Sequence, residues 1–152
     1  MTVHVELGDH EIVVTVDDLR VPLPVGVLTL SADLTTDPPR PEDLTNAIGL
    51  VADHLDDVVR DRPDLIGAAL TISGPEAAAM VAVEVGGTAA LPFELDRAAA
   101  EDVFRTIVTE DRGARAHNPG LDVLLVDRIV AGCCAVVAVM RKLQVDAVTV
   151  LP

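Results

Sequence analysis

The sequence predicts an α/β domain in which helices cover a mixed β-sheet of five strands. Alternating apolar runs come first, apolar residues at helical spacing follow, and helical segments separate the later strands. The chain has 152 residues, and 50% of them are hydrophobic, which is enough for one domain spanning 1–152 with a substantial core. That core must be aliphatic, because there is no Trp or Tyr and there are only two Phe.

The first strands form a predicted hairpin. Residues 3–14, "VHVELGDHEIVV", are two alternating runs joined by Gly8, Asp9 and His10. A third strand is expected after residues 17–18, and its part with Pro22 and Pro24 is interpreted as a sheet edge, a bend or an entry segment, because proline cannot donate to a ladder. Within this segment, residues 26–34 are predicted to form the more regular strand.

A helix and a buried strand are expected next. Pro41 suits the first helical position, and apolar spacing continues to about Arg60. "LIGAALTIS", residues 65–73, is continuously apolar, which is typical of a strand buried on both faces. A helix is then predicted from Pro75, with Ser73 or Gly74 as its cap.

The last third is predicted as two helices and a final strand. Residues 86–95 are expected to be a loop, and Asp96 to cap a helix that buries Val103, Phe104, Ile107 and Val108. Residues 109–120 are interpreted as a polar connector. A buried helix is then expected over about 123–143, and the chain closes with the strand "VDAVTVLP".

Charge and cysteine content limit the classes of function. The formal net charge of −14 repels polyanions, so no nucleic-acid partner is expected, and Arg112, Arg115 and His117 are interpreted as part of a solvated loop. No signal peptide or membrane span is predicted. Adjacent Cys133 and Cys134 on one helix favour core packing over a disulfide or a nucleophile, so a reducing, cytoplasmic location is expected.

No metal site or catalytic residue is predicted from the residues alone. Asp53, His54 and Asp57 lie within one helical turn of each other, but a solvated helix face explains them better than a cation cage. His4, His10 and His117 lack the spacing of a zinc site.

The order of elements is that of a ribonuclease-H-like half domain of actin-like ATPases. Three further stretches resemble the exopolyphosphatase and guanosine-pentaphosphate phosphatase (Ppx/GppA) family. They are "PVGVLTLSADLTTDPPRPEDLTNAIGLVADHLDDV" at 24–58, "FELDRAAAEDVFRTIVTEDRGARAHNPG" at 93–120, and "RIVAGCCAVVAVMRKLQVDAVTV" at 128–150. Together they resemble the second half of the family's catalytic module.

The resemblance implies a function and a set of site residues. Family members remove terminal phosphate with a divalent metal, in a cleft between two actin-like halves, and the first half has no counterpart in these residues. Phosphate binding is implied at the turn with Glu6 and Gly8, at Ser73 and Gly74, and at Gly132.

This chain departs from the family pattern at each of these places. One glycine of three remains at the turn, and Asp9 stands where phosphate would approach, which costs about 4 kcal/mol at roughly 4 Å and an effective dielectric near 20. Pro75 removes a donor N–H, and Cys133 replaces a glycine.

These departures favour a catalytically degenerate domain that acts as a binding or assembly module. It needs no cofactor, and Mg²⁺ is expected only if the family's activity is retained. The alternative is a fragment or subunit of an exopolyphosphatase, active once a first half completes the cleft. A third hypothesis is a structural homodimer that pairs through an exposed apolar patch. The expected partner is therefore a second copy or a separate first-half domain, and not a membrane.

Overall fold

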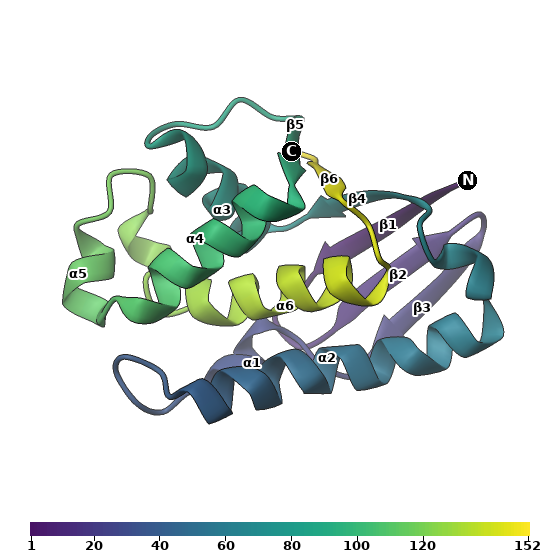
Figure 1. Ribbon diagram of the computed structural model, residues 1–152, viewed down its shortest axis with the longest axis horizontal. Coiled ribbons are helices and arrows are strands. Elements are labelled where there is room, and N and C mark those ends of the chain that lie inside the picture. Colours follow the sequence, from purple (N-terminus) through teal and green to yellow (C-terminus); the bar gives the residue numbers. More distant parts are fainter.

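The computed structural model describes residues 1–152 and contains one six-stranded mixed sheet with the order β3-β2-β1-β4-β6-β5 (Figure 1). Its strands are β1 Thr2–Leu7, β2 Ile12–Val16, β3 Leu19–Leu23, β4 Ala69–Ser73, β5 Phe93–Asp96 and β6 Ala147–Val150. β1 pairs in parallel with β4, and β4 with β6, whereas β2, β3 and β5 join antiparallel to their neighbours. The prediction of a mixed α/β sheet covered by helices is confirmed, with one strand more than expected.

Helices cover one face of this sheet. They are α1 Val27–Ala32, α2 Pro41–Asp61, α3 Pro75–Val85, α4 Arg97–Thr109, α5 Arg112–Ala116 and α6 Ile129–Lys142. α2, α6 and α4 lie side by side in front of the sheet (Figure 1). Along β1, Val3, Val5 and Leu7 are buried toward the helices, while His4 and Glu6 alternate onto the other face and remain partly or fully exposed.

Helix α6 is the centre of the core. Every residue from Ile129 to Met140 is buried, because α2, α3 and α4 all contact this helix. A helix enclosed in this way has no polar face, which explains the uninterrupted apolar sequence. It begins at Ile129, later than predicted, because Val123–Leu125 form a separate 3-10 turn.

The third strand was predicted in the wrong place. The hairpin of β1 and β2 is confirmed, and the edge position expected for Pro22 is confirmed by β3 at one end of the sheet. Residues 26–34, however, contain the helix α1 and no strand. Val27 and Leu30 are three positions apart and both buried, so this apolar run follows the period of a helix.

The sixth strand, β5, falls in a segment predicted as a loop. Phe93 pairs opposite Val150, and Leu95 opposite Val148, so β5 extends the sheet beyond β6. The buried Leu95 between the exposed Glu94 and Asp96 shows the alternation of a strand, but four residues were too short to stand out.

Strand β4 is shorter and more exposed than predicted. It begins at Ala69, and only Leu70 and Ile72 are buried, so the expectation of burial on both faces was wrong. Within β4, Thr71 and Ser73 on the open face alternate with the buried Leu70 and Ile72. Helix α3 begins at Pro75 as predicted and has Gly74 as its N-cap, without a side-chain cap bond from Ser73.

The remaining helices follow the predicted patterns. α2 runs from Pro41 to Asp61 and buries Ala47, Val51, Leu55 and Val58. The Asp96 carboxylate caps α4 by accepting a 2.7 Å hydrogen bond from the Ala99 N–H. The connector at 109–120 contains the short α5, in which Arg115 is only 6% exposed, so its assignment to a solvated loop was wrong.

Both cysteines are buried in the core, as predicted. Cys133 and Cys134 are free thiols on α6. Burial raises the pKa of Cys134 to about 12 and also raises that of Cys133, so both stay protonated at neutral pH. None of the helices is long and apolar enough to cross a membrane.

Candidate phosphate site

Two of the three predicted phosphate-binding places, the turn after Glu6 and the pair Ser73–Gly74, lie together at the carboxyl ends of β1 and β4. The parallel register sets Glu6 opposite Ser73, and Gly74 follows at once. Gly74 has φ +135, and a Cβ there would lie 3.0 Å from Leu7, so the two chain segments touch where the strands end. A pocket of 430 Å³ opens here, lined by Glu6, Leu7, Ser73, Gly74, Pro75, Ala78, Leu151 and Pro152.

The β1–β2 turn is fixed by its own backbone and by α1. The Gly8 N–H donates to the Glu11 carbonyl at 2.9 Å, so it is not free for an anion. The carbonyls of Gly8 and Asp9 accept from the N–H groups of Val27 and Leu28, both at 2.9 Å. Gly26 was missed as a site-building residue, although a glycine inside an apolar run was a usable signal.

Gly26 lets α1 begin directly against the turn. A Cβ on Gly26 would lie 2.5 Å from the His10 nitrogen, which no side chain could occupy. The turn is therefore held in one position by the first residues of α1.

Three charged groups run inward from this turn. Arg128 Nη2 pairs with Asp9 Oδ1, and Arg128 Nε donates to Glu76 Oε1 at 2.8 Å. Glu76 lies in the first turn of α3 and is fully buried, and its second oxygen has no hydrogen-bond partner. We call Asp9, Arg128 and Glu76 the carboxylate–arginine chain. Sequence reasoning assigned no role to Arg128 or Glu76, although an acid inside the apolar run "PEAAAM" was a signal.

Arg128 is held as a cation by its two partners. Burial alone would lower its pKa, but the hydrogen bond and charge of Asp9, together with the charge of Glu76, raise it overall. The guanidinium is thus charged and already engaged on two sides.

Gly132, the third of the predicted phosphate-binding places, lies apart from the other two. It is buried within α6, and a Cβ on it would lie 2.7 Å from Glu76 Cγ and closer still to Glu76 Cβ. It is also absent from the lining of the pocket at the strand ends. The glycine makes room for the Glu76 side chain.

Ser73 and His4 form a small polar cluster on the open sheet face. His4 Nδ1 lies 2.8 Å from Thr71 Oγ1, and His4 Nε2 lies 3.1 Å from Ser73 Oγ. The imidazole therefore orients both hydroxyls, and Ser73 is bound to His4 instead of capping α3.

A magnesium ion does not fit these residues. No three His, Cys, Asp or Glu side chains gather closely enough to hold a metal. At the turn, Asp9 is paired with Arg128 and Glu11 with Arg20, which leaves the exposed Glu6 as a single carboxylate.

The fold of this chain matches solved structures of Ppx/GppA and exopolyphosphatase-like proteins. An exopolyphosphatase-like protein superposes with a TM-score of 0.85 at 17% sequence identity, over 99% of this chain and 55% of its own. A Ppx/GppA family member from Aquifex aeolicus gives 0.82 at 16% identity, over 99% of this chain and 51% of its own. This chain has the fold of half of a Ppx/GppA protein. An exopolyphosphatase from Cytophaga hutchinsonii gives 0.84 at 15% identity, over 99% of this chain and 53% of its own.

The Ppx/GppA half-fold confirms the predicted resemblance at the level of architecture, including its ribonuclease-H-like, actin-like class. This chain spans about half the length of the Ppx/GppA structures it matches. No family model and no curated protein matches the sequence. At such low identity, the likeness establishes the fold alone.

Proposed function

We propose that this protein is a catalytically degenerate exopolyphosphatase-like domain that works as a binding or assembly module. The carboxylate–arginine chain carries the proposal. A phosphate entering the β1–β2 turn meets the Asp9 carboxylate, and the nearby Arg128 guanidinium is already paired with Asp9 and Glu76. An unpaired carboxylate about 4 Å from an anion repels it by about 4 kcal/mol at an effective dielectric near 20. Arg128 offsets part of this repulsion at Asp9 but offers no free side to phosphate, so the turn disfavours phosphate.

Three further features, two of the backbone and one of a side chain, support the same proposal. The Gly8 N–H is used within the turn. Pro75, at the start of α3, has no N–H to offer an anion. The space beside Gly132 is filled by Glu76. Many proteins bind phosphate with a nest of free backbone N–H groups. Here the Gly8 N–H is already bonded and Pro75 has none, so such a nest cannot form from these residues.

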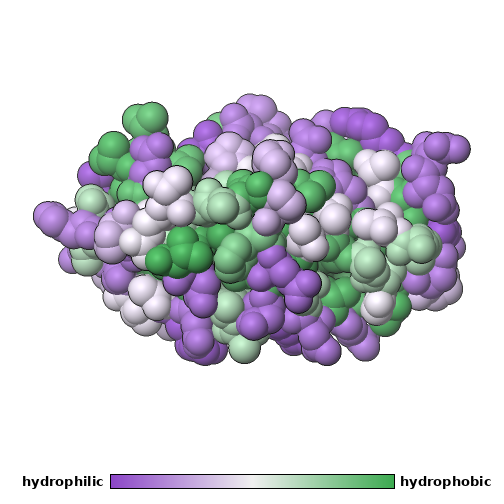
Figure 2. Space-filling view, turned by 90° about the horizontal axis from the view of Figure 1, so that it is seen from above, coloured by the Kyte–Doolittle hydropathy of each residue, from purple (hydrophilic) through white to green (hydrophobic).

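An assembly role is supported by the half-fold. We propose that the partner is a separate first-half domain or a second copy of this chain. Val123 and Leu124, on the turn before α6, are 66% and 80% exposed and offer a small apolar contact. Figure 2 shows small groups of apolar residues among hydrophilic ones on the visible side of the molecule.

A phosphate-release assay tests the loss of catalysis. We expect no release above the buffer rate from polyphosphate or guanosine pentaphosphate in the presence of Mg²⁺. Glu6→Ala is the matched variant, because Glu6 is the free carboxylate at the pocket. Turnover by the unaltered chain that Glu6→Ala abolishes would contradict the proposal.

Sedimentation velocity tests the assembly role. We expect a mass above that of one chain, either alone or after addition of a first-half domain from a Ppx/GppA protein. Leu124→Ser should weaken that association, because it removes the most exposed large apolar side chain. A strict monomer under both conditions would refute the assembly role.

A second candidate is a subunit that becomes an active phosphohydrolase when a first half completes the cleft. The 430 Å³ pocket, where Glu6 and Ser73 are accessible, favours this candidate. Mixing the chain with a first-half domain decides between the two. Phosphate release that depends on both chains and is lost in Glu6→Ala would establish the active subunit.

A further inference from the structure

A second pocket lies beside the start of α6, and Glu76 is not among its lining residues. It has a volume of 310 Å³ and is formed by the end of α1, the segment after it, α5 and the start of α6. Its polar lining residues are Ser31, Thr35, Thr36, Asp37, Arg112, Arg115 and Asp127. It shares no lining residue with the pocket at the strand ends. Its size suits a small ligand.

Arg115 is the unusual residue of this pocket. Its side chain is only 7% exposed, whereas most arginines of this chain lie at the surface. Nη1 donates to the Glu110 carbonyl at 2.6 Å, and Nη2 lies 3.5 Å from Asp37 Oδ1. Nε is buried and has no acceptor. A buried, unpaired donor costs about 1–3 kcal/mol, so this guanidinium is short of acceptors.

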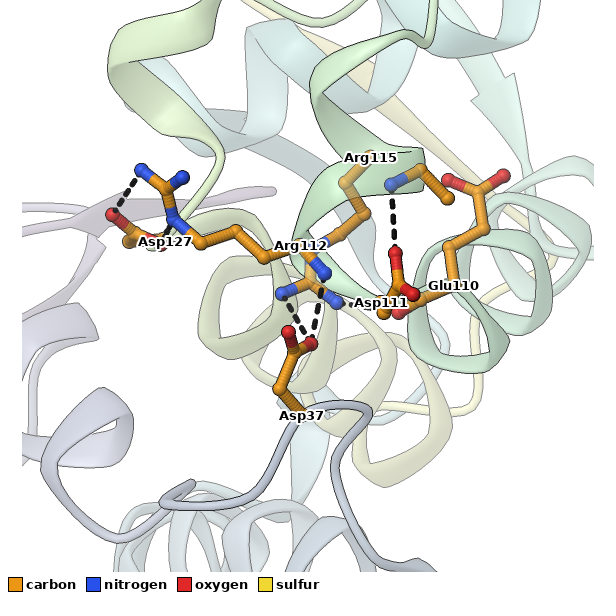
Figure 3. A network of polar contacts seen from close by, with 7 residues as sticks. Asp37, Glu110, Asp111, Arg112, Arg115 and Asp127 are labelled. Carbon is orange, nitrogen blue, oxygen red and sulfur yellow. Dashed lines mark hydrogen bonds and ion pairs between the residues drawn. The ribbon is translucent and has the colours of Figure 1, made fainter.

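The two acids of the pocket are occupied by other donors. The Asp37 carboxylate accepts the Arg112 backbone N–H at 2.8 Å, and Asp127 accepts from the Arg112 guanidinium at 2.6 and 3.2 Å (Figure 3). That hydrogen bonding lowers the pKa of Asp127, which is therefore ionised. Because each acid is paired with an N–H donor, neither is free to hold a cation.

A hydroxyl group in the same lining also lacks a partner. Ser31 Oγ is buried without a hydrogen bond, and Thr35 and Thr36 contribute further hydroxyls. A guanidinium fork and hydroxyl donors together match the oxygens of a carboxylate or a phosphate.

We propose that this pocket binds a small oxyanion group, a carboxylate or a phosphate, with Arg115 as its main ligand and Ser31 as a second donor. The incoming oxygens bind Arg115 beside Asp37, because the 3.5 Å contact between Arg115 Nη2 and Asp37 Oδ1 is long and leaves that nitrogen without a close acceptor. Asp37 keeps the backbone N–H of Arg112. The acids in the lining favour a ligand with a single negative charge over a polyanion.

Side-chain NMR of arginine Nε–H groups tests the proposal directly. Sodium acetate, sodium phosphate and sodium chloride are titrated separately at equal ionic strength. We expect the Arg115 resonance to shift saturably with acetate, phosphate or both, and not with chloride. A response to acetate alone identifies a carboxylate site, and a response to phosphate alone identifies a phosphate site. Arg60, exposed on α2 and paired with Asp57, is the control resonance and should not move.

Two variants separate binding from folding. Arg115→Gln should abolish the saturable response as followed on the neighbouring backbone amides. Ser31→Ala removes a hydroxyl without a partner, so the fold is retained, and we expect affinity to weaken roughly fivefold, as for one lost neutral hydrogen bond. An Arg115 resonance that ignores both oxyanions, that responds equally to chloride, or that titrates unchanged in Ser31→Ala would overturn the proposed site.

Discussion

Gly132 and Glu76 show how one glycine can place a charge inside the core. Glu76 is fully buried, and its side chain runs along the space that a Cβ on Gly132 would fill. Arg128 pairs with the Glu76 carboxylate and also with Asp9, which is nearer the surface. A buried ion pair of this kind is seldom a net source of stability, but loss of one partner is costly. Gly132 is therefore a structural requirement of the carboxylate–arginine chain.

Gly132→Ala should destabilise the fold. The added methyl group overlaps Glu76, and overpacking of a core typically costs about 1–3 kcal/mol. Gly49→Ala is the matched control, because Gly49 is also helical and a Cβ there meets nothing within 4 Å. Gly49→Ala should be neutral or stabilising by up to about 1 kcal/mol. Urea unfolding measures both variants, and equal stability would contradict the role given to Gly132.

Sequence patterns predicted some of these residues and missed others. The acidic turn at Gly8–Glu11 was visible because it is local. Arg128 lies 119 residues from Asp9 in the sequence, and no short-range pattern reports such a contact. For the same reason Arg115 was assigned to a solvated loop, although the fold buries its side chain against Asp37 and the Glu110 carbonyl.

At the scale of elements, a bidentate ion pair between Glu101 of α4 and Arg141 of α6 joins the two helices. Arg141 Nε and Nη2 donate to the two Glu101 oxygens at 2.8 and 2.7 Å. The Glu101 side chain is only 17% exposed. Hydrogen bonding from Arg141 lowers the pKa of Glu101, although burial acts in the opposite direction. This ion pair makes part of the stability depend on pH.

The sign of that dependence follows from proton linkage. The unfolded chain takes up a proton at Glu101 near its ordinary pKa of 4.5, whereas the folded protein holds the carboxylate ionised to lower pH. The stabilisation is therefore present above that pH and is lost as the pH falls through the lowered folded pKa. Glu101→Gln should be less stable at about pH 6 and should lose less stability by about pH 3.5. Unfolding in urea at both values measures this, with the exposed Glu84→Gln as control. An identical pH dependence in Glu101→Gln and the unaltered chain would refute the assignment.

The elements also show where sequence-based prediction succeeds. Long amphipathic helices such as α2 and α4 were predicted well, because their apolar stripes extend over several turns. α1 was mistaken for a strand because its six residues form a short apolar run, too short for the helical spacing of Val27 and Leu30 to stand out. β5 was missed because its four residues become a strand only by pairing with β6.

At the scale of the whole molecule, this chain combines the half-fold of Ppx/GppA structures, with helices on one face of the sheet, and a β1–β2 turn that carries the Asp9 carboxylate. The order of elements left several α/β folds open, and the three family-like stretches were needed to predict this architecture. The chemistry of the turn was only half predicted, since Asp9 was visible in the sequence but its pairing with Arg128 required the fold. Our central claim is that this pairing keeps phosphate chains out of the turn.

The most direct test follows the Arg128 Nε–H resonance while a polyphosphate of defined length is added. In the unaltered chain we predict no saturable shift, because Arg128 stays paired with Asp9 and Glu76. Asp9→Asn removes the repelling charge and frees one side of the guanidinium, so we predict that it binds at least about tenfold more tightly, equivalent to about 1.4 kcal/mol. A saturable shift of the Arg128 resonance in the unaltered chain, with an affinity equal to that of Asp9→Asn, would contradict the account.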